Sequence, residues 1–177
     1  IRFCATNLET GIDFTISGTV KTEGAIALPA GVFKEITSSF SGTGMLTIEQ
    51  TGDTALISSG SAKSTIKTLS YDDFPTLSIP DSPSTSFSLS GVILRDLLQS
   101  VASCASPSTV RPELASILLS AEGGVVKAVA TDSFRLAEKK VSVGGKVSPF
   151  SILVPAKNAI DIAQTLPDDE ITVNADT

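Results

Sequence analysis

One short sequence pattern occurs twice in this chain, and this repetition constrains the fold more than any other feature. The segment Ala128–Ala137 reads Ala-Val-Ala-Thr-Asp-Ser-Phe-Arg-Leu-Ala. A weaker version, Cys-Ala-Thr-Asn-Leu-Glu, occupies residues 4–9. The offset between the equivalent residues Thr6 and Thr131 is 125 positions.

A second pair of segments repeats with nearly the same offset. Residues 28–36 and 154–162 each begin with an apolar residue followed by Pro-Ala, and Pro29 and Pro155 are 126 positions apart. Because two landmarks agree within one residue, the sequence predicts tandem copies of one domain. We expect both prolines to lie in the first turn of equivalent helices, where the missing N–H group costs nothing.

Composition indicates a packed globular protein. Of 177 residues, 41% are hydrophobic and only 18% are charged, which argues against disorder. No apolar run approaches the roughly 20 residues needed to cross a bilayer, and no signal peptide is recognisable. A soluble protein of the cytoplasm, without a membrane partner, is therefore expected. The chain opens at Ile1, inside an expected strand and not at Met, so we expect it to be a fragment.

The two cysteines carry no sign of metal or redox chemistry. Cys4 and Cys104 lie in apolar surroundings without the spacing of metal ligands. We therefore predict that both are buried thiols and not a disulfide or a redox pair.

The first part of the chain reads as strands around one helix. The alternation of Ile12, Phe14 and Ile16 with polar residues predicts a half-buried strand. The helix from Pro29 is expected to bury one apolar face. The residues expected on this face are Val32, Phe33, Ile36 and Phe40. A meander is expected to follow, with strands at residues 46–49, 55–58 and 64–69.

A proline-rich stretch separates the two halves. Between residues 71 and 86 lie Pro75, Pro80 and Pro83 among Ser, Thr and Asp residues. Such a composition does not continue a central strand or helix, so we place the domain linker there.

The second half shows an internal duplication of its own. Ser90 is a plausible N-cap for a helix that runs to about residue 105, and a hairpin turns at residues 122–124. A strand over residues 134–143 and a strand that leads into the helix from Pro155 follow. Asp96 aligns with Asp161, 65 positions on, so each domain is interpreted as a pseudo-duplicate.

These motifs resemble the bacterial DNA polymerase III beta subunits, the beta sliding clamps. Residues 130–137 resemble that family's second-domain signature, and residues 71–77, Tyr-Asp-Asp-Phe-Pro-Thr-Leu, resemble the motif at the end of its first domain. The resemblance implies an α+β fold, the DNA-clamp or processivity fold, with tandem domains, helices on the inner face and antiparallel sheets outside. Residues 1–82 would be the later part of the first domain and residues 83–177 most of the second, with the third absent.

The resemblance further implies a homodimeric ring that encircles duplex DNA. A ring that slides needs diffuse positive charge toward phosphates and no reading of bases. By resemblance, Lys34, Arg95 and Lys157 on the three helices face the DNA, although ordinary solvated helix charges are an open alternative. Gly31 and Ala156 stand where related clamps often carry Arg. The net charge of −6 argues against tight static binding but not against encirclement.

The second implied site is a cleft that receives short hydrophobic peptides from the replicative DNA polymerase, the clamp loader and other proteins. The family frequently has Gly-His or Ser-Tyr where this chain has Ser133-Phe134, so we expect a shifted peptide preference. Half of the cleft would come from the third domain. The alternative that Leu114, Phe134 and Leu136 are core strand residues stays open. The residues that match the cleft are Leu114, Thr131, Ser133, Phe134, Arg135 and Leu136.

No catalytic constellation, metal site or cofactor motif is recognisable. The chain contains no His, so a Ser-His-Asp arrangement is impossible. The acidic run at residues 168–170 follows Leu-Pro, where carboxylates commonly support a turn. The sequence thus predicts a nonenzymatic accessory subunit of a DNA polymerase. The alternative is a protein-interaction module with a clamp-like fold but no DNA ring, and a third domain in the open reading frame would separate the two.

Overall fold

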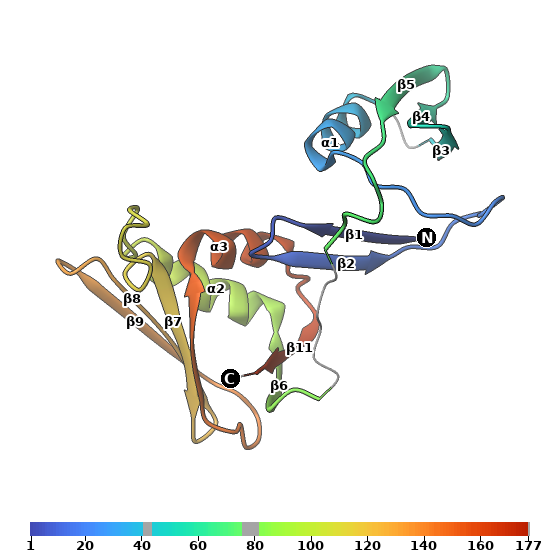
Figure 1. Ribbon diagram of the computed structural model, residues 1–177. Coiled ribbons are helices and arrows are strands. Elements are labelled where there is room, and N and C mark those ends of the chain that lie inside the picture. Colours follow the sequence, from blue (N-terminus) through green and yellow to red (C-terminus); the bar gives the residue numbers. More distant parts are fainter. Residues whose placement is uncertain (41–43, 76–81, 177) are drawn as a thin grey trace. The chain divides into compact units, whose positions relative to one another are not determined.

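The computed structural model describes residues 1–40, 44–75 and 82–176, and forms two compact units, Ile1–Ser78 and Ile79–Thr177 (Figure 1). The middle of the expected linker, residues 76–81, lies outside the described part, whereas the flanking Pro75 and Pro83 lie outside helices and strands.

The first unit combines a hairpin with a helix and a three-stranded meander. The hairpin strands are antiparallel, and the meander has the order β3-β4-β5. Phe33 and Ile36 of the helix and its C-cap residue Phe40 pack against buried Ile57 and Ile66 of the meander. The elements are β1 (Arg2–Thr6), β2 (Gly11–Thr15), α1 (Ala30–Ser39), β3 (Leu46–Thr51), β4 (Thr54–Ser59) and β5 (Ala62–Lys67).

The prediction for the apolar face of α1 was wrong at one position. Val32 is 44% exposed, whereas Phe33, Ile36 and Phe40 contact the core. Val32 is not among the apolar residues that pack against the buried residues of the meander.

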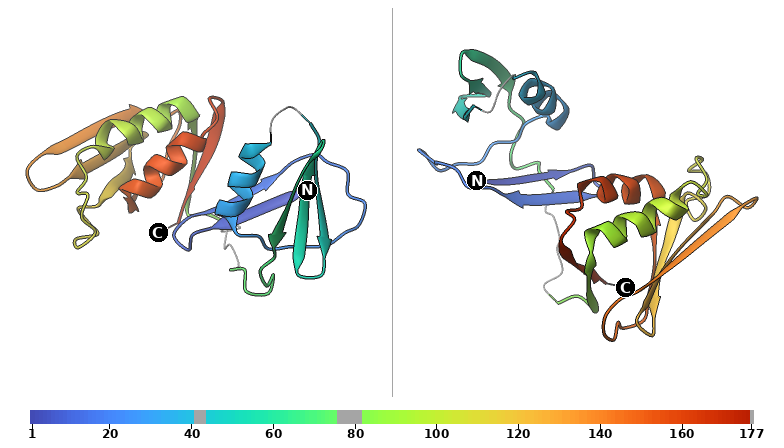
Figure 2. Two further views of the ribbon diagram at one scale, coloured as in Figure 1. Left: turned by 90° about the horizontal axis from the view of Figure 1, so that it is seen from above. Right: turned by 180° about the vertical axis from the view of Figure 1, so that it is seen from behind.

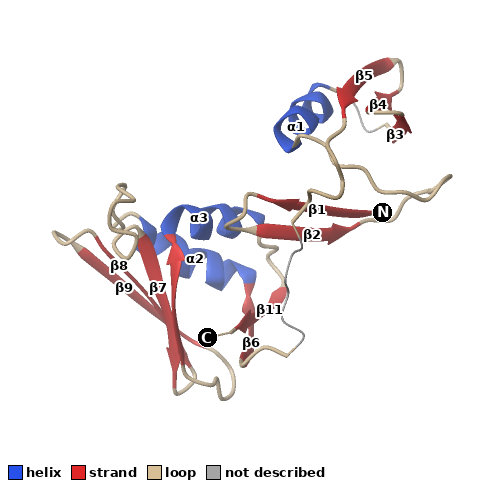
Figure 3. Cartoon of the chain, in the orientation of Figure 1, coloured by secondary structure: helices blue, strands red, loops and turns tan. Residues whose placement is uncertain are grey.

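The second unit packs two helices against a four-stranded antiparallel sheet of order β10-β7-β8-β9. The two helices contact each other and lie over one face of the sheet (Figures 2 and 3). A separate pair, β11 and β6, is also antiparallel. The elements are β6 (Thr85–Ser90), α2 (Gly91–Ala102), β7 (Ser116–Glu122), β8 (Val125–Thr131), β9 (Leu136–Ser142), β10 (Phe150–Pro155), α3 (Ala156–Thr165) and β11 (Glu170–Ala175).

Sequence alternation explains this core. Along β8, Val126, Ala128 and Ala130 are buried while their neighbours are only partly covered, because successive side chains of a strand point to opposite faces. The stripe of α2 that packs onto this face is fully apolar. As predicted, Ser90 caps the helix by accepting a hydrogen bond from the Val92 N–H at 3.2 Å. The buried residues of α2 that form the stripe are Leu94, Leu97, Leu98 and Val101.

The structure confirms that a helix begins at each of the two Pro-Ala segments. Pro29 and Pro155 are the N-caps of α1 and α3, each ten residues long. They lie one position before the first turn and not within it. The internal duplication is also visible: β6 leads directly into α2 at Gly91, and β10 leads into α3 at Ala156, which is 65 positions later.

The equivalent hairpins of the two units differ in what covers them. By the offset of 125, β1 and β2 correspond to β8 and β9, and α2 packs against β8 and β9. On the hairpin of the first unit, Ile12 and Phe14 share a face with Phe3 and Ala5. Ile12 is nevertheless 51% exposed and Phe14 is 58% exposed. The predicted strand is therefore present, but its apolar face is open in the described residues.

The prediction of two buried thiols was wrong for Cys4. Both cysteines are free, Cys104 is half-buried and Cys4 is exposed. Cys4 lies on the polar face of the β1–β2 hairpin, where the ion pair between Arg2 and Asp13 also lies, because β1 alternates its side chains between two faces.

Candidate partner-docking loop and DNA-facing helices

The motif at the end of β8 folds into a loop that satisfies its own polar groups. We call residues 131–136 the signature loop. The Thr131 hydroxyl donates to the Arg135 carbonyl at 2.8 Å and accepts from the Ser133 N–H at 3.2 Å. One carboxylate oxygen of Asp132 accepts from the N–H groups of Phe134 and Arg135, both at 3.0 Å. Ser133 has φ 78°, in the region that favours glycine.

The first unit builds the same loop with different residues. The Thr6 hydroxyl donates to the Thr10 carbonyl at 2.8 Å and accepts from the Leu8 N–H at 3.0 Å. The Asn7 side-chain oxygen accepts from the N–H groups of the two residues after Leu8. Leu8, at the position of Ser133, also has a positive φ, of 74°. The two copies of the repeat therefore share a loop geometry and not only a similar sequence.

Two side chains of the signature loop are directed to solvent. Phe134 is 98% exposed and Leu136 is 65% exposed. The alternative that these two residues belong to the core is therefore wrong. Both side chains are therefore available for contact with another molecule.

Leu114 lies in the neighbouring segment between α2 and β7. It is half-buried, and its carbonyl accepts a hydrogen bond from the Ser106 N–H at 2.8 Å. The pKa of Arg135 is raised chiefly by Asp132 and to a smaller extent by Cys104, just after α2. Arg135 of the signature loop therefore lies near the start of the segment that holds Leu114.

The Asp132 carboxyl is strongly stabilised in its ionised form. The side chain of Arg135 donates a hydrogen bond to this carboxylate at 2.9 Å. This bond, together with those from the N–H groups of Arg135 and Phe134, lowers the pKa of Asp132 from 3.8 to about 2. The pKa of Arg135 is raised in turn by the same pair.

The signature loop should therefore resist acid. Because the folded pKa of Asp132 is depressed, its contribution is present above pH 3.8 and is lost as the pH falls through about 2. We expect the amide resonances of Phe134 and Arg135 in NMR spectra to shift with a midpoint near pH 2. A midpoint near pH 3.8 would mean that these hydrogen bonds contribute nothing.

The three cationic residues predicted to face DNA differ in their surroundings. Lys34 on α1 and Lys157 on α3 are exposed and make no ion pair with the described residues. Arg95 on α2 instead donates to the carbonyls of Ala163 and Leu166 at the end of α3.

Arg95 also forms an ion pair with Asp168 at 2.9 Å, so most of its donors are already engaged within the unit. Sequence reasoning missed this role, because α3 ends 70 positions after Arg95 and nothing local indicates the contact. We expect Lys34 and Lys157 to provide more of any phosphate contact than Arg95 does.

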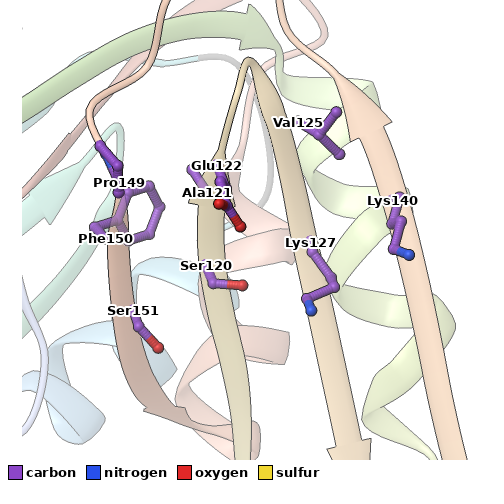
Figure 4. Close-up of a pocket in the computed structure, with 9 residues that line it drawn as sticks. All are labelled: Ser120, Ala121, Glu122, Val125, Lys127, Lys140, Pro149, Phe150 and Ser151. Atoms are coloured by element: carbon purple, nitrogen blue, oxygen red, sulfur yellow. The ribbon is translucent and has the colours of Figure 1, made fainter.

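An open hollow of about 780 Å³ lies on the sheet of the second unit and was not predicted (Figure 4). Ser151, Ser120, Lys127 and Lys140 stand directly opposite one another across the four strands. Both lysines pair with Glu138, at 3.8 Å and 2.9 Å. This cross-strand row depends on strand register, which the sequence alone does not give.

The described residues offer neither a metal-binding cluster nor a membrane-spanning helix. In the described ranges, no group of three His, Cys, Asp or Glu side chains could hold a metal ion. None of the helices that are described has both the length and the apolar character needed to span a membrane.

Known proteins share both the sequence pattern and the fold. The family model of the DNA polymerase III beta subunit N-terminal domain matches residues 1–78, and that of the central domain matches residues 88–175. The beta sliding clamp of Proteus mirabilis is 30% identical over 143 residues, 81% of this chain and 39% of the relative. The beta sliding clamp of Vibrio cholerae is 27% identical over 94% of this chain and 45% of the relative.

Solved structures agree with these relatives. A sliding clamp from Pseudomonas aeruginosa, determined bound to griselimycin, has a TM-score of 0.89 and 26% identity, and the match covers 99% of this chain and 48% of that one. The chain thus spans about two-fifths of the length of the curated relatives and half of the solved structures. From the two family models, the shared sequence and the shared fold it follows that this chain belongs to the DNA polymerase III beta subunits, the beta sliding clamps.

Proposed function

We propose that this chain is part of a replication processivity factor: a homodimeric ring that encircles duplex DNA and tethers the replicative DNA polymerase. Residues 1–82 form the later part of the first clamp domain and residues 83–177 most of the second. The role is that of a nonenzymatic accessory subunit in the cytoplasm. The observation that best supports this proposal is the repeated unit itself, with its matching helices and matching loops, in a chain whose relatives are named beta sliding clamps.

The exposed charges of the helices suit a sliding contact with DNA. Lys34 is followed by Glu35, and Lys157 precedes Asp161 by one helical turn. Each cation therefore has an anion on its own helix, which keeps the local field weak. A weak field favours sliding along phosphates over tight static binding.

The salt dependence of DNA binding tests this surface in the full-length protein. Each phosphate contact that is removed should flatten the log–log salt dependence by roughly one unit per subunit. We expect this flattening for Lys34→Ala and Lys157→Ala, and less for Arg95→Ala. The matched control is Lys63→Ala with Lys146→Ala, two exposed lysines outside the helices. Equal slopes in all variants would remove Lys34 and Lys157 from the DNA-facing surface.

We assign the tethering of the polymerase to the signature loop and Leu114. Apolar side chains at a rim bind a short peptide by removing its apolar surface from water. Phe134 and Leu136 offer such surface on a loop whose backbone is already fixed by its own hydrogen bonds. A preformed loop loses little entropy on binding, which favours affinity.

A further inference from the structure

Asp96 is a carboxylate on one of the helices that are proposed to face DNA. It follows Arg95 on α2, on the side of the helix opposite the buried apolar stripe, and its side chain is 62% exposed. Phosphates repel an exposed carboxylate, so Asp96 on its own would oppose the approach of DNA. Arg95 does not offset this charge, because it is already paired with Asp168.

Lys139 of β9 neutralises this carboxylate from 43 positions further along the chain. Its ammonium group donates to Asp96 Oδ2 at 2.6 Å and to the Ser100 hydroxyl at 2.9 Å. Ser100 lies one turn after Asp96 on α2, and its hydroxyl donates in turn to the Asp96 carbonyl at 2.6 Å. The hydrogen bond from Lys139 lowers the pKa of Asp96 below its ordinary value. The two charges therefore form one ordered pair.

Packing alone does not account for a cation at this position. Ala137, Lys139 and Val141 share one face of β9, and Ala137 and Val141 pack against the core. Lys139 thus extends from an otherwise apolar face to reach α2. By the offset of 125, the equivalent residue of the first unit is Phe14, in the same register on its hairpin. The repeat therefore accepts an aromatic side chain where the second unit has an ammonium group.

The charge balance of the two helices of the second unit depends on this lysine. The helices and the aspartate that follows α3 carry three carboxylates but only two cations. Lys139 supplies a third cation, so the surface is neutral and not negative. A neutral surface lets phosphates pass, whereas a negative one repels them. The carboxylates are Asp96, Asp161 and Asp168, and the two cations are Arg95 and Lys157.

From these contacts we propose that Lys139 is a positioning residue for DNA sliding: its ammonium group cancels the charge of Asp96, so that phosphates can pass along α2. This inference rests on the proposed DNA-facing role of the helices and adds to it a residue of the sheet. Lys139 acts through Asp96 and needs no phosphate contact of its own.

Binding of the full-length protein to a short labelled duplex tests the inference. At about 50 mM salt we expect Lys139→Ala to weaken binding about threefold, and the loss to shrink at about 150 mM salt, because exposed charges are screened over shorter distances. Asp96→Asn should bind more tightly than the wild type. The double variant Lys139→Ala/Asp96→Asn should bind as the wild type does. Since the pair is exposed, all melting temperatures should stay close to that of the wild type.

The matched control is Lys140→Ala. Lys140 is the next residue of β9, on the opposite face of the strand, where it pairs with Glu138 at 2.9 Å. Its substitution removes the same charge and also leaves a carboxylate with a weaker partner. We expect it to change duplex binding by less than about 1.5-fold, because this charge lies on the face of the sheet that α2 does not cover.

The outcomes separate the inference from the proposed function. If Lys34→Ala and Lys157→Ala leave duplex binding unchanged, the DNA-facing role of the helices fails and the inference fails with it. If those two variants weaken binding but Lys139→Ala behaves as Lys140→Ala does, the DNA-facing role stands and the assignment of Lys139 is overturned. A loss of binding in Asp96→Asn, without recovery in the double variant, would likewise overturn it, since the pair would then only fasten β9 to α2.

Discussion

Replacing Gly91 with Ala is expected to lower the free energy of unfolding of the second unit by about 3 kcal/mol or more. Gly91 is the first residue of α2, and its N–H donates to the Asp169 carbonyl at 2.9 Å. A Cβ atom there would lie 1.9 Å from the Pro167 carbonyl oxygen and 3.1 Å from its carbon. Both are backbone atoms, so relief requires that the connection between α3 and β11 move.

A movement of that connection would also disturb its neighbours. Asp168 lies in it and pairs with Arg95 of α2, and β11, which follows it, pairs with β6. The start of a helix does not itself demand glycine, since the equivalent first residue of α3 is Ala156. The requirement at Gly91 arises from the close approach of Pro167.

Gly31→Ala is the matched control. Gly31 lies at the second position of α1, and nothing would come within 4 Å of an added Cβ atom. Alanine favours the helix over glycine by roughly 1 kcal/mol in a helix interior, so we expect no loss and a small gain in stability. Urea unfolding followed by circular dichroism distinguishes the two variants. A Gly91→Ala protein as stable as the Gly31→Ala protein would show that the contact with Pro167 is easily relieved.

Local sequence features predicted much of the secondary structure. Ser90 caps α2 as expected, and Pro29 and Pro155 begin α1 and α3. These features act over one or two turns of chain, so they are readable without knowledge of the tertiary fold. The signature loop is likewise local, since Thr131 and Asp132 make their hydrogen bonds within four positions.

Features that depend on distant segments were not predictable. Apolar alternation could not decide whether Leu136 is core or rim, because that depends on which face α2 covers. Val32 was misjudged because tertiary packing decides which residues of α1 contact the meander. Cys4 was misjudged because the pairing of β1 with β2 puts it on the polar face of that hairpin. The contacts of Arg95 with the end of α3, and those of Lys139 with Asp96 at 2.6 Å, join residues more than 40 positions apart. Sequence spacing alone does not indicate such pairs.

Retention on circular DNA is expected to differ greatly from retention on linear DNA. A closed ring leaves DNA only by opening or by sliding off an end, whereas an electrostatic binder leaves equally fast from either form. The weakly charged helices of this chain make the contrast larger, because little direct attraction holds the protein once an end is available.

The decisive measurement uses the full-length protein, placed on a nicked circular duplex by a clamp loader and separated from free protein by gel filtration. Cutting the circle once with a restriction enzyme should release nearly all of the bound protein, while the uncut circle retains it. Equal dissociation from the cut and uncut DNA, or no retention on the circle, would contradict encirclement and would favour a protein-interaction module with a clamp fold.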